Sequence, residues 1–210
     1  EGKVEQLVLV NCCDSMRRVY DIVESTGKCK FLYMLDMPHE DNDCEKVKLA
    51  QGIHRLKKAY EKFSGKTFDR SGFLNAFSHE PVDNQPYIGV LGVRVSGILE
   101  KMIRDNIRMD VENLTCTGGR RLAVIREELE KMEDDAMFLA YADALLSQMP
   151  CFRMNNSTRR NRLYLDPNLK GIIYHTIKFC DYYGFEYASI KRDIKVPLLK
   201  IETDFTSQSA

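Results

Sequence analysis

The strongest structural signal in the chain is Ile172-Ile-Tyr-His-Thr-Ile-Lys-Phe-Cys180-Asp181. Its apolar, β-branched start predicts a strand, and a helical pattern follows the cysteine. The same order occurs near the N-terminus, in Val8-Leu-Val-Asn-Cys12-Cys13-Asp14. A strand that leads directly into a helix is typical of parallel βαβ units. We therefore expect each cysteine at the carboxyl edge of a parallel sheet, which is where open α/β sheets bind their ligands.

Strands and helices are expected to alternate along the rest of the chain, which predicts an α/β fold with parallel sheets and helical connections. The predicted strands are 4–10, 31–35, 87–93, 109–114, 171–177 and 196–201. The predicted helices begin near 14, 41–43, 69, 95, 121 and 182, and the helix over 121–149 is expected to bend near Asp134.

The polar, proline-containing segment Ser78–Gln85 predicts a domain boundary. Residues 1–80 then form the C-terminal part of a first α/β domain with a helical connection, and residues 81–210 form a second α/β domain. The chain lacks an initial Met and opens almost directly on a strand. We therefore expect a fragment of a longer protein, with its first unit incomplete.

Composition argues against several classes of partner. The 210 residues contain 31 basic and 31 acidic side chains, so no basic face or tail indicates nucleic acid or an anionic membrane. The longest apolar runs have strand length, well below the ~20 residues that span a bilayer. Seven cysteines, an odd number, in a chain without a secretion signal favour reduced thiols and a cytoplasmic location.

Cys13 and Cys180 are the candidate metal ligands. Each precedes an aspartate and a helix, and a helix N-terminus stabilises a thiolate and favours metal ligation. The alternative is a small buried residue at a tight turn, with the aspartate as an ordinary N-cap. Cys12 is the weaker candidate of the doublet, because neighbouring side chains point opposite ways along a strand. Two soft donors indicate a metal or an iron–sulfur cluster without completing its site.

Other motifs carry weaker signals. Cys116 lies in a glycine-rich turn that continues into Arg120 and Arg121, and Cys151 precedes Arg159 in a polar loop; these arginines could contact phosphate. Glu202-Thr-Asp204 ends the last predicted strand, where its carboxylates could hold a ligand or cap the turn. Cys29, Cys44 and the four histidines show no metal-ligand spacing, and no side chain identifies a catalytic acid or base.

Three segments carry a family resemblance. They are Asn11-Cys-Cys-Asp-Ser15, Lys178-Phe-Cys-Asp-Tyr-Tyr-Gly-Phe-Glu-Tyr187 and Ile201-Glu-Thr-Asp-Phe-Thr206. Together they resemble the 2-hydroxyacyl-CoA dehydratase family, which includes the benzoyl-CoA reductase subunits, over essentially the whole chain. The resemblance implies two Rossmann-like or flavodoxin-like units. It also implies that Cys13 and Cys180 are two of three cysteine ligands to a [4Fe–4S] cluster, with the third upstream of this chain.

The resemblance further implies an acyl-CoA substrate, a homologous partner subunit in a homo- or heterodimer, and an ATP-hydrolysing iron–sulfur activator. The implied reaction is radical elimination of water from a 2-hydroxyacyl-CoA after one-electron reduction. The alternatives are a related reductase, of the benzoyl-CoA reductase or double-cubane type, and a non-catalytic partner subunit of the same fold. A scaffold in which all cysteines are structural remains the simplest alternative.

Overall fold

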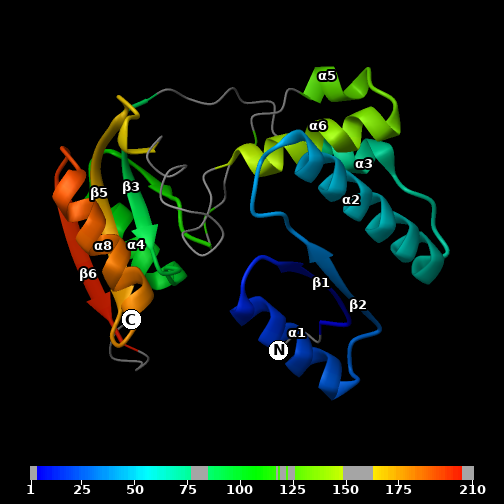
Figure 1. Ribbon diagram of the computed structural model, residues 1–210, viewed down its shortest axis with the longest axis horizontal. Helices are drawn as coiled ribbons and strands as arrows, with labels where there is room; N and C mark the ends of the chain where they lie inside the picture. Colours follow the sequence, from blue (N-terminus) through cyan, green and yellow to red (C-terminus); the bar gives the residue numbers. More distant parts are fainter. Residues whose placement is uncertain are drawn as a thin grey trace. The chain divides into compact units, whose positions relative to one another are not determined.

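The computed structural model describes residues 4–76, 85–116, 118, 122, 126–148 and 163–204 (Figure 1). The chain forms two compact units. Unit 1 comprises Glu1–Pro81 and Leu122–Gln148, and unit 2 comprises Val82–Arg121 and Met149–Ala210. Both contain parallel strands joined by helices, which confirms the predicted α/β class. None of the helices in the described residues is long and apolar enough to cross a membrane.

Unit 1 pairs two parallel strands with a group of helices. In its described part, β1 (Gln6–Asn11) pairs with β2 (Phe31–Asp36) through the intervening helix α1 (Asp14–Thr26). Gly27 ends α1 in the left-handed conformation (φ 61°), as the sequence predicts. The remaining helices are α2 (Asp43–Ser64), α3 (Arg70–Asn75), α5 (Arg126–Glu130) and α6 (Asp134–Ser147).

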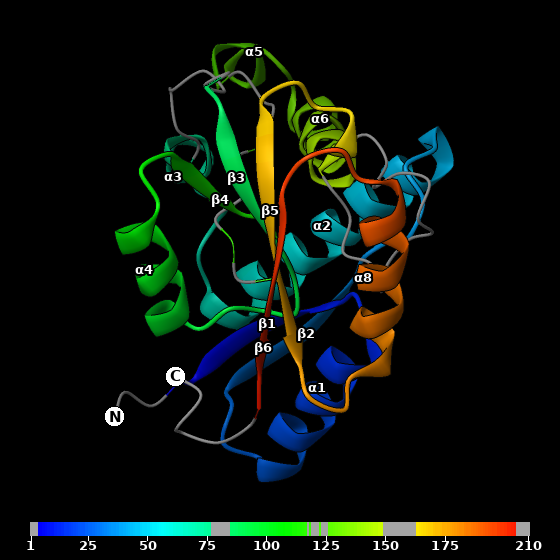
Figure 2. The same cartoon turned by 90° about the vertical axis from the view of Figure 1, so that its left-hand side faces the viewer.

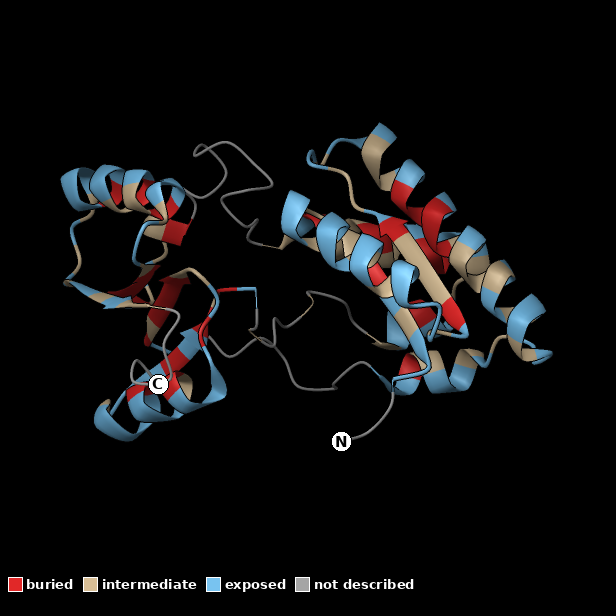
Figure 3. Cartoon of the chain, turned by 90° about the horizontal axis from the view of Figure 1, so that it is seen from below, coloured by how far each residue is buried: buried red, intermediate tan, exposed pale blue. Residues whose placement is uncertain are grey.

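The helices of residues 126–147 belong to unit 1, whereas the expected division placed them in a domain over 81–210. The reason is apolar packing: α6 contributes Met137 and Phe138 to the same core as Leu49 of α2 and Leu35 of β2. Figure 3 shows the buried residues of each unit on the faces that its elements turn toward one another. If residues 81–210 formed a separate domain, this apolar face of α6 would be exposed to water.

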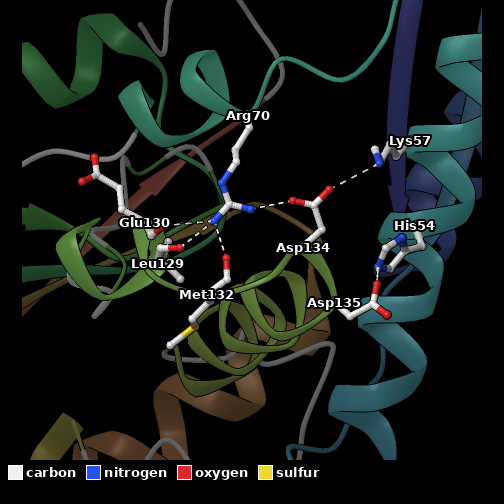
Figure 4. Close-up of polar contacts among 8 residues, drawn as sticks. All are labelled: His54, Lys57, Arg70, Leu129, Glu130, Met132, Asp134 and Asp135. Carbon is white, nitrogen blue, oxygen red and sulfur yellow. Dashed lines mark hydrogen bonds and ion pairs between the residues drawn. The ribbon is translucent and has the colours of Figure 1, made fainter.

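A single arginine fixes the break between α5 and α6, which the sequence places near Asp134. The Arg70 guanidinium donates to the carbonyl oxygen of Leu129 at 3.0 Å, to that of Met132, and to the Asp134 carboxylate (Figure 4). These carbonyls lie where the helical hydrogen bonds of α5 stop, and that of Leu129 also accepts the Met132 N–H at 3.2 Å. Arg70 supplies further donors and holds α3 to the α5–α6 corner.

Unit 2 is built on a parallel sheet. Its described strands are β3 (Tyr87–Gly92), β4 (Asp110–Asn113), β5 (Leu169–Ile177) and β6 (Leu198–Thr203), in the order β4-β3-β5-β6. Helix α4 (Gly97–Asn106) connects β3 to β4, and α8 (Asp181–Asp193) connects β5 to β6. The chain therefore leaves β3 toward one side and returns to its other side with β5, which makes β3–β5 a topological switch point.

Helices cover both faces of this sheet (Figure 2). Val90 and Ile173 pack with Leu99 of α4 in one core cluster. Ile172 and Tyr174, the neighbours of Ile173 along β5, pack in the other cluster with residues of α8. Adjacent strand residues face opposite sides, so a sheet buried on both faces needs a continuous apolar run. The run over Gly171–Ile177 meets that requirement and places β5 in the middle of the unit.

Candidate functional site

Cys180 lies at the carboxyl end of β5, next to the switch point. Its backbone N–H donates to the carbonyl oxygen of Ile177 at 3.1 Å, and the residue is the N-cap of α8. The thiol is partly buried against the core cluster that contains Tyr183. The structure thus places Cys180 at the sheet edge that the sequence predicts, at the position where sheets of this topology bind ligands.

Cys13 has the matching position in unit 1. It follows β1 directly, is partly buried, and is the N-cap of α1 with an extended backbone (φ −166°). The neighbouring Cys12 is also partly buried, and its N–H donates to the Val10 carbonyl oxygen at 2.8 Å. Strand, cysteine, aspartate and helix therefore follow one another in both units, as the sequence predicts.

Both cysteines occupy the N-cap position without a capping hydrogen bond from the side chain. The side chains of Cys13 and Cys180 make no capping hydrogen bond, whereas Ser96 accepts one from the Leu99 N–H in α4 and Asn42 accepts one from the Glu45 N–H in α2. A Ser, Thr, Asp or Asn at such a position stabilises a helix by about 1 kcal/mol. Glu133, the N-cap of α6, likewise makes no side-chain cap bond.

Phe179, immediately before Cys180, has an unusual backbone. Its φ is 66°, and the residue is 98% exposed. A positive φ is costly for a residue with a Cβ atom, and such strain is concentrated at functional turns. The conformation lets the chain turn from β5 into α8 within three residues, and so it sets the position of Cys180.

Paired charges lie at the end of β6, where the sequence places Glu202 and Asp204. Lys178 Nζ lies 3.6 Å from Asp204 Oδ2, which links the turn after β5 to the end of β6. Lys200 Nζ lies 2.8 Å from Glu202 Oε2, and this hydrogen bond lowers the pKa of Glu202. Two ion pairs therefore lie at the carboxyl edge of the sheet in unit 2. Lys178, in one of them, is two residues before Cys180.

His175 is the residue at this edge that sequence reasoning undervalued. It is buried in β5, as a packing residue would be, but its ring also makes specific hydrogen bonds. Nδ1 lies 3.1 Å from the carbonyl oxygens of Val93 and Arg94, and Nε2 lies 2.9 Å from Thr203 Oγ1. Carbonyl oxygens only accept, so Nδ1 carries a proton. In the neutral ring Nε2 then accepts from the Thr203 hydroxyl, and His175 ties the ends of β3 and β6 together across β5.

Gly92 allows β3 to approach β5 at this point. Its φ is 93°, and a Cβ atom at this position would lie 2.1 Å from the His175 carbonyl oxygen. The next residue, Val93, donates its N–H to the same oxygen at 2.9 Å. Gly89, three residues earlier, lies inside β3. The tight approach between the strands explains Gly92.

The other predicted candidates divide into two groups. Cys116 is exposed after β4, Cys44 is exposed on α2, and Cys29 donates its thiol to the Phe31 carbonyl oxygen at 3.1 Å. Arg120, Arg121, Cys151 and Arg159 lie outside the described residues. Within the ranges that the structure describes, no group of three or more His, Cys, Asp or Glu side chains is placed to hold a metal ion.

The parallel sheet of unit 2, with helices on both of its faces, defines an α/β protein. The family model described as 2-hydroxyglutaryl-CoA dehydratase, D-component, matches residues 83–210. The chain therefore belongs to this dehydratase component family. No curated protein matches the chain.

Cys13 and Cys180 fit an iron–sulfur cluster by donor chemistry. Clusters of this kind are held by cysteine thiolates, and both residues are free cysteines at strand ends with partly accessible sulfur. Each unit contributes one of these cysteines at the start of a 13-residue helix. Each residue can supply one thiolate to such a cluster, and further thiolates are needed to complete a donor set.

Proposed function

We propose that this chain is an iron–sulfur subunit of a 2-hydroxyacyl-CoA dehydratase-type enzyme of the cytoplasm. Its reaction is the radical elimination of water from a 2-hydroxyacyl-CoA after one-electron reduction by an ATP-dependent activator. Cys13 and Cys180 hold a [4Fe–4S] cluster together with a third cysteine upstream of the chain. The enzyme pairs this chain with a homologous subunit in a homo- or heterodimer.

The observation that carries this proposal is the repeated position of the two cysteines. Each begins a helix directly after a parallel strand, and neither uses its sulfur as a cap. The family match over residues 83–210 supports a dehydratase component. A scaffold with purely structural cysteines does not explain why the same position is repeated in both units.

When bound, the cluster supplies one-electron chemistry and, where one iron lacks a protein ligand, a Lewis acid. The chain's own residues hold the site. His175 fixes the ends of β3 and β6, and the turn at Phe179 fixes the thiol of Cys180. The ion pair of Lys178 with Asp204 ties the turn after β5 to the end of β6.

A second proposal keeps the same cluster ligands and changes the reaction. A related reductase, of the benzoyl-CoA reductase or double-cubane type, would use the same sheet edge for electron transfer. A partner subunit of this fold would provide the interface without turning over substrate. Metal content separates the double-cubane form from the others, and turnover with activator, ATP and a 2-hydroxyacyl-CoA separates the dehydratase from the rest.

The test is the content of iron and acid-labile sulfide in protein that includes the upstream segment and is purified without oxygen. About four irons per chain are expected, and about eight for a double cubane. Cys13→Ala and Cys180→Ala should each lose the cluster and its visible absorption. Cys44→Ala is the matched control, because that cysteine is exposed on α2. Iron that persists in both variants, or its absence from the reconstituted parent protein, contradicts the proposed ligands.

A further inference from the structure

A groove in unit 1 is lined by charged side chains of α2 and α6. It lies along α2 and the first turns of α6 and has a volume of about 750 Å³. This volume falls within the range of small-molecule sites, roughly 300–1,000 Å³. Its lining includes four side chains of α2 that can carry positive charge: His54, Arg55, Lys57 and Lys58.

The carboxylates of the groove already have partners. Asp134 pairs with Arg70 and lies 3.7 Å from Lys57 Nζ, and Asp135 Oδ1 lies 2.9 Å from His54 Nε2 (Figure 4). These contacts join the start of α6 to α2 and α3. The Asp134 carboxylate is shared between Arg70 and Lys57, so it is not available to the remaining cations of α2.

Arg55 and Lys58 are those remaining cations. They lie three residues apart on one face of α2, and both are exposed. Within the part of the chain that the structure describes, neither side chain forms a hydrogen bond or an ion pair. Two adjacent cations without a partner repel each other, and an anion bound between them removes this repulsion.

Apolar side chains extend the groove beside these cations. Val47 on α2 and Leu139 on α6 line it and are 44% and 40% exposed. A ligand that combined a multivalent anion with an apolar or flat part would match both features. The planar guanidinium of Arg55 binds phosphate oxygens in pairs, and Lys58 adds a point charge.

We propose that the α2–α6 groove binds a phosphorylated small molecule, with its phosphates on Arg55 and Lys58 and its apolar part against Val47 and Leu139. The inference rests on unit 1 alone and holds whether or not the chain carries a cluster. The phosphates could come from a free nucleotide or from the nucleotide part of a coenzyme A thioester, and binding measurements separate these sources.

The experiment is isothermal titration calorimetry of the whole chain with inorganic pyrophosphate, ADP and coenzyme A at low ionic strength. The double variant Arg55→Ala/Lys58→Ala should weaken binding by at least about tenfold, because it removes two charged hydrogen-bond donors. Asp135→Asn should tighten it, because it removes a carboxylate from the groove. Lys62→Ala/Lys66→Ala is the charge-matched control, since both residues are exposed and lie outside the groove.

Binding of all three ligands with this pattern of variants supports a phosphate site, and tighter binding of ADP than of coenzyme A identifies the free nucleotide as the source. The reverse order identifies the thioester carrier. Circular dichroism melts show whether each variant is folded. The proposal is overturned if none of the ligands binds, or if the Arg55 and Lys58 changes have no more effect than the control pair.

Discussion

Nε2 of His175 lies 2.9 Å from Oγ1 of Thr203, although the two residues belong to different strands. Nδ1 of the same ring lies 3.1 Å from the carbonyl oxygens of Val93 and Arg94. One buried ring therefore joins the carboxyl ends of three neighbouring strands. These ends form the edge that carries Cys180. The hydrogen bonds of the His175 ring therefore help to fix the positions of the strand ends at this edge.

Thr203→Val should lower the free energy of unfolding of unit 2 by about 1–2 kcal/mol, because it leaves the buried Nε2 of His175 without a donor. The change keeps the volume of the side chain, so lost packing contributes little. Thr203→Ser retains the hydroxyl group and should be close to the parent. Hydrogen exchange at the β5 amides measures the effect within unit 2; equal protection in both variants contradicts the proposed bond.

Gly92→Ala should destabilise unit 2 by at least about 3 kcal/mol, because the new Cβ meets the His175 carbonyl oxygen and the positive φ becomes strained. Gly97→Ala is the matched control. A Cβ at Gly97 has no neighbour within 4 Å, and the residue begins α4. That change should be neutral or stabilise by up to about 1 kcal/mol. Urea denaturation of both variants measures the difference, and similar midpoints would show that the close approach is absent.

Phe179→Gly should stabilise the turn before Cys180 by about 1 kcal/mol, because glycine adopts a positive φ without steric cost. The lost ring contributes little to the core, since Phe179 is 98% exposed. Phe179→Ala removes the same ring but keeps a Cβ atom, so it should leave stability near that of the parent. Thermal unfolding of the three proteins separates backbone strain from the ring, and an equal gain in both variants would refute the strain.

We expect unit 2 to lose stability at alkaline pH because of Tyr87. Burial and the hydrogen bond from Tyr87 Oη to Asp166, 2.9 Å long, raise the pKa of this phenol above its ordinary value of 10.0. The folded state then holds the proton more tightly than the unfolded chain does. Its stabilising contribution is complete below pH 10.0 and falls as the pH rises through the folded-state pKa.

Tyr87→Phe should remove this part of the alkaline slope and lower stability at neutral pH by about 1 kcal/mol through loss of the hydrogen bond. Urea denaturation of both proteins between neutral pH and pH 11 gives the two slopes. Identical slopes would mean that Tyr87 does not titrate differently in the two states. Tyr182→Phe is a suitable control, because that tyrosine is 42% exposed on α8 of the same unit.

The local elements followed from sequence pattern. The apolar run over Gly171–Ile177 gave a strand, Gly27 ended the first helix, and the interruption near Asp134 separated α5 from α6. These features depend on residues that are close in the chain, so propensity and periodicity report them directly. The positions of Cys13 and Cys180 at strand ends followed for the same reason.

The sequence by itself therefore determined the α/β class, the strand-to-helix turns and the two cysteine positions within them. Tertiary structure alone decided the strand order β4-β3-β5-β6, the packing of α6 against α2, and the bonds from His175 to Val93 and Thr203. These last features join residues that lie far apart in the chain. Local propensity carries no information about such partners, since apolar burial and hydrogen-bond satisfaction across the whole unit select them.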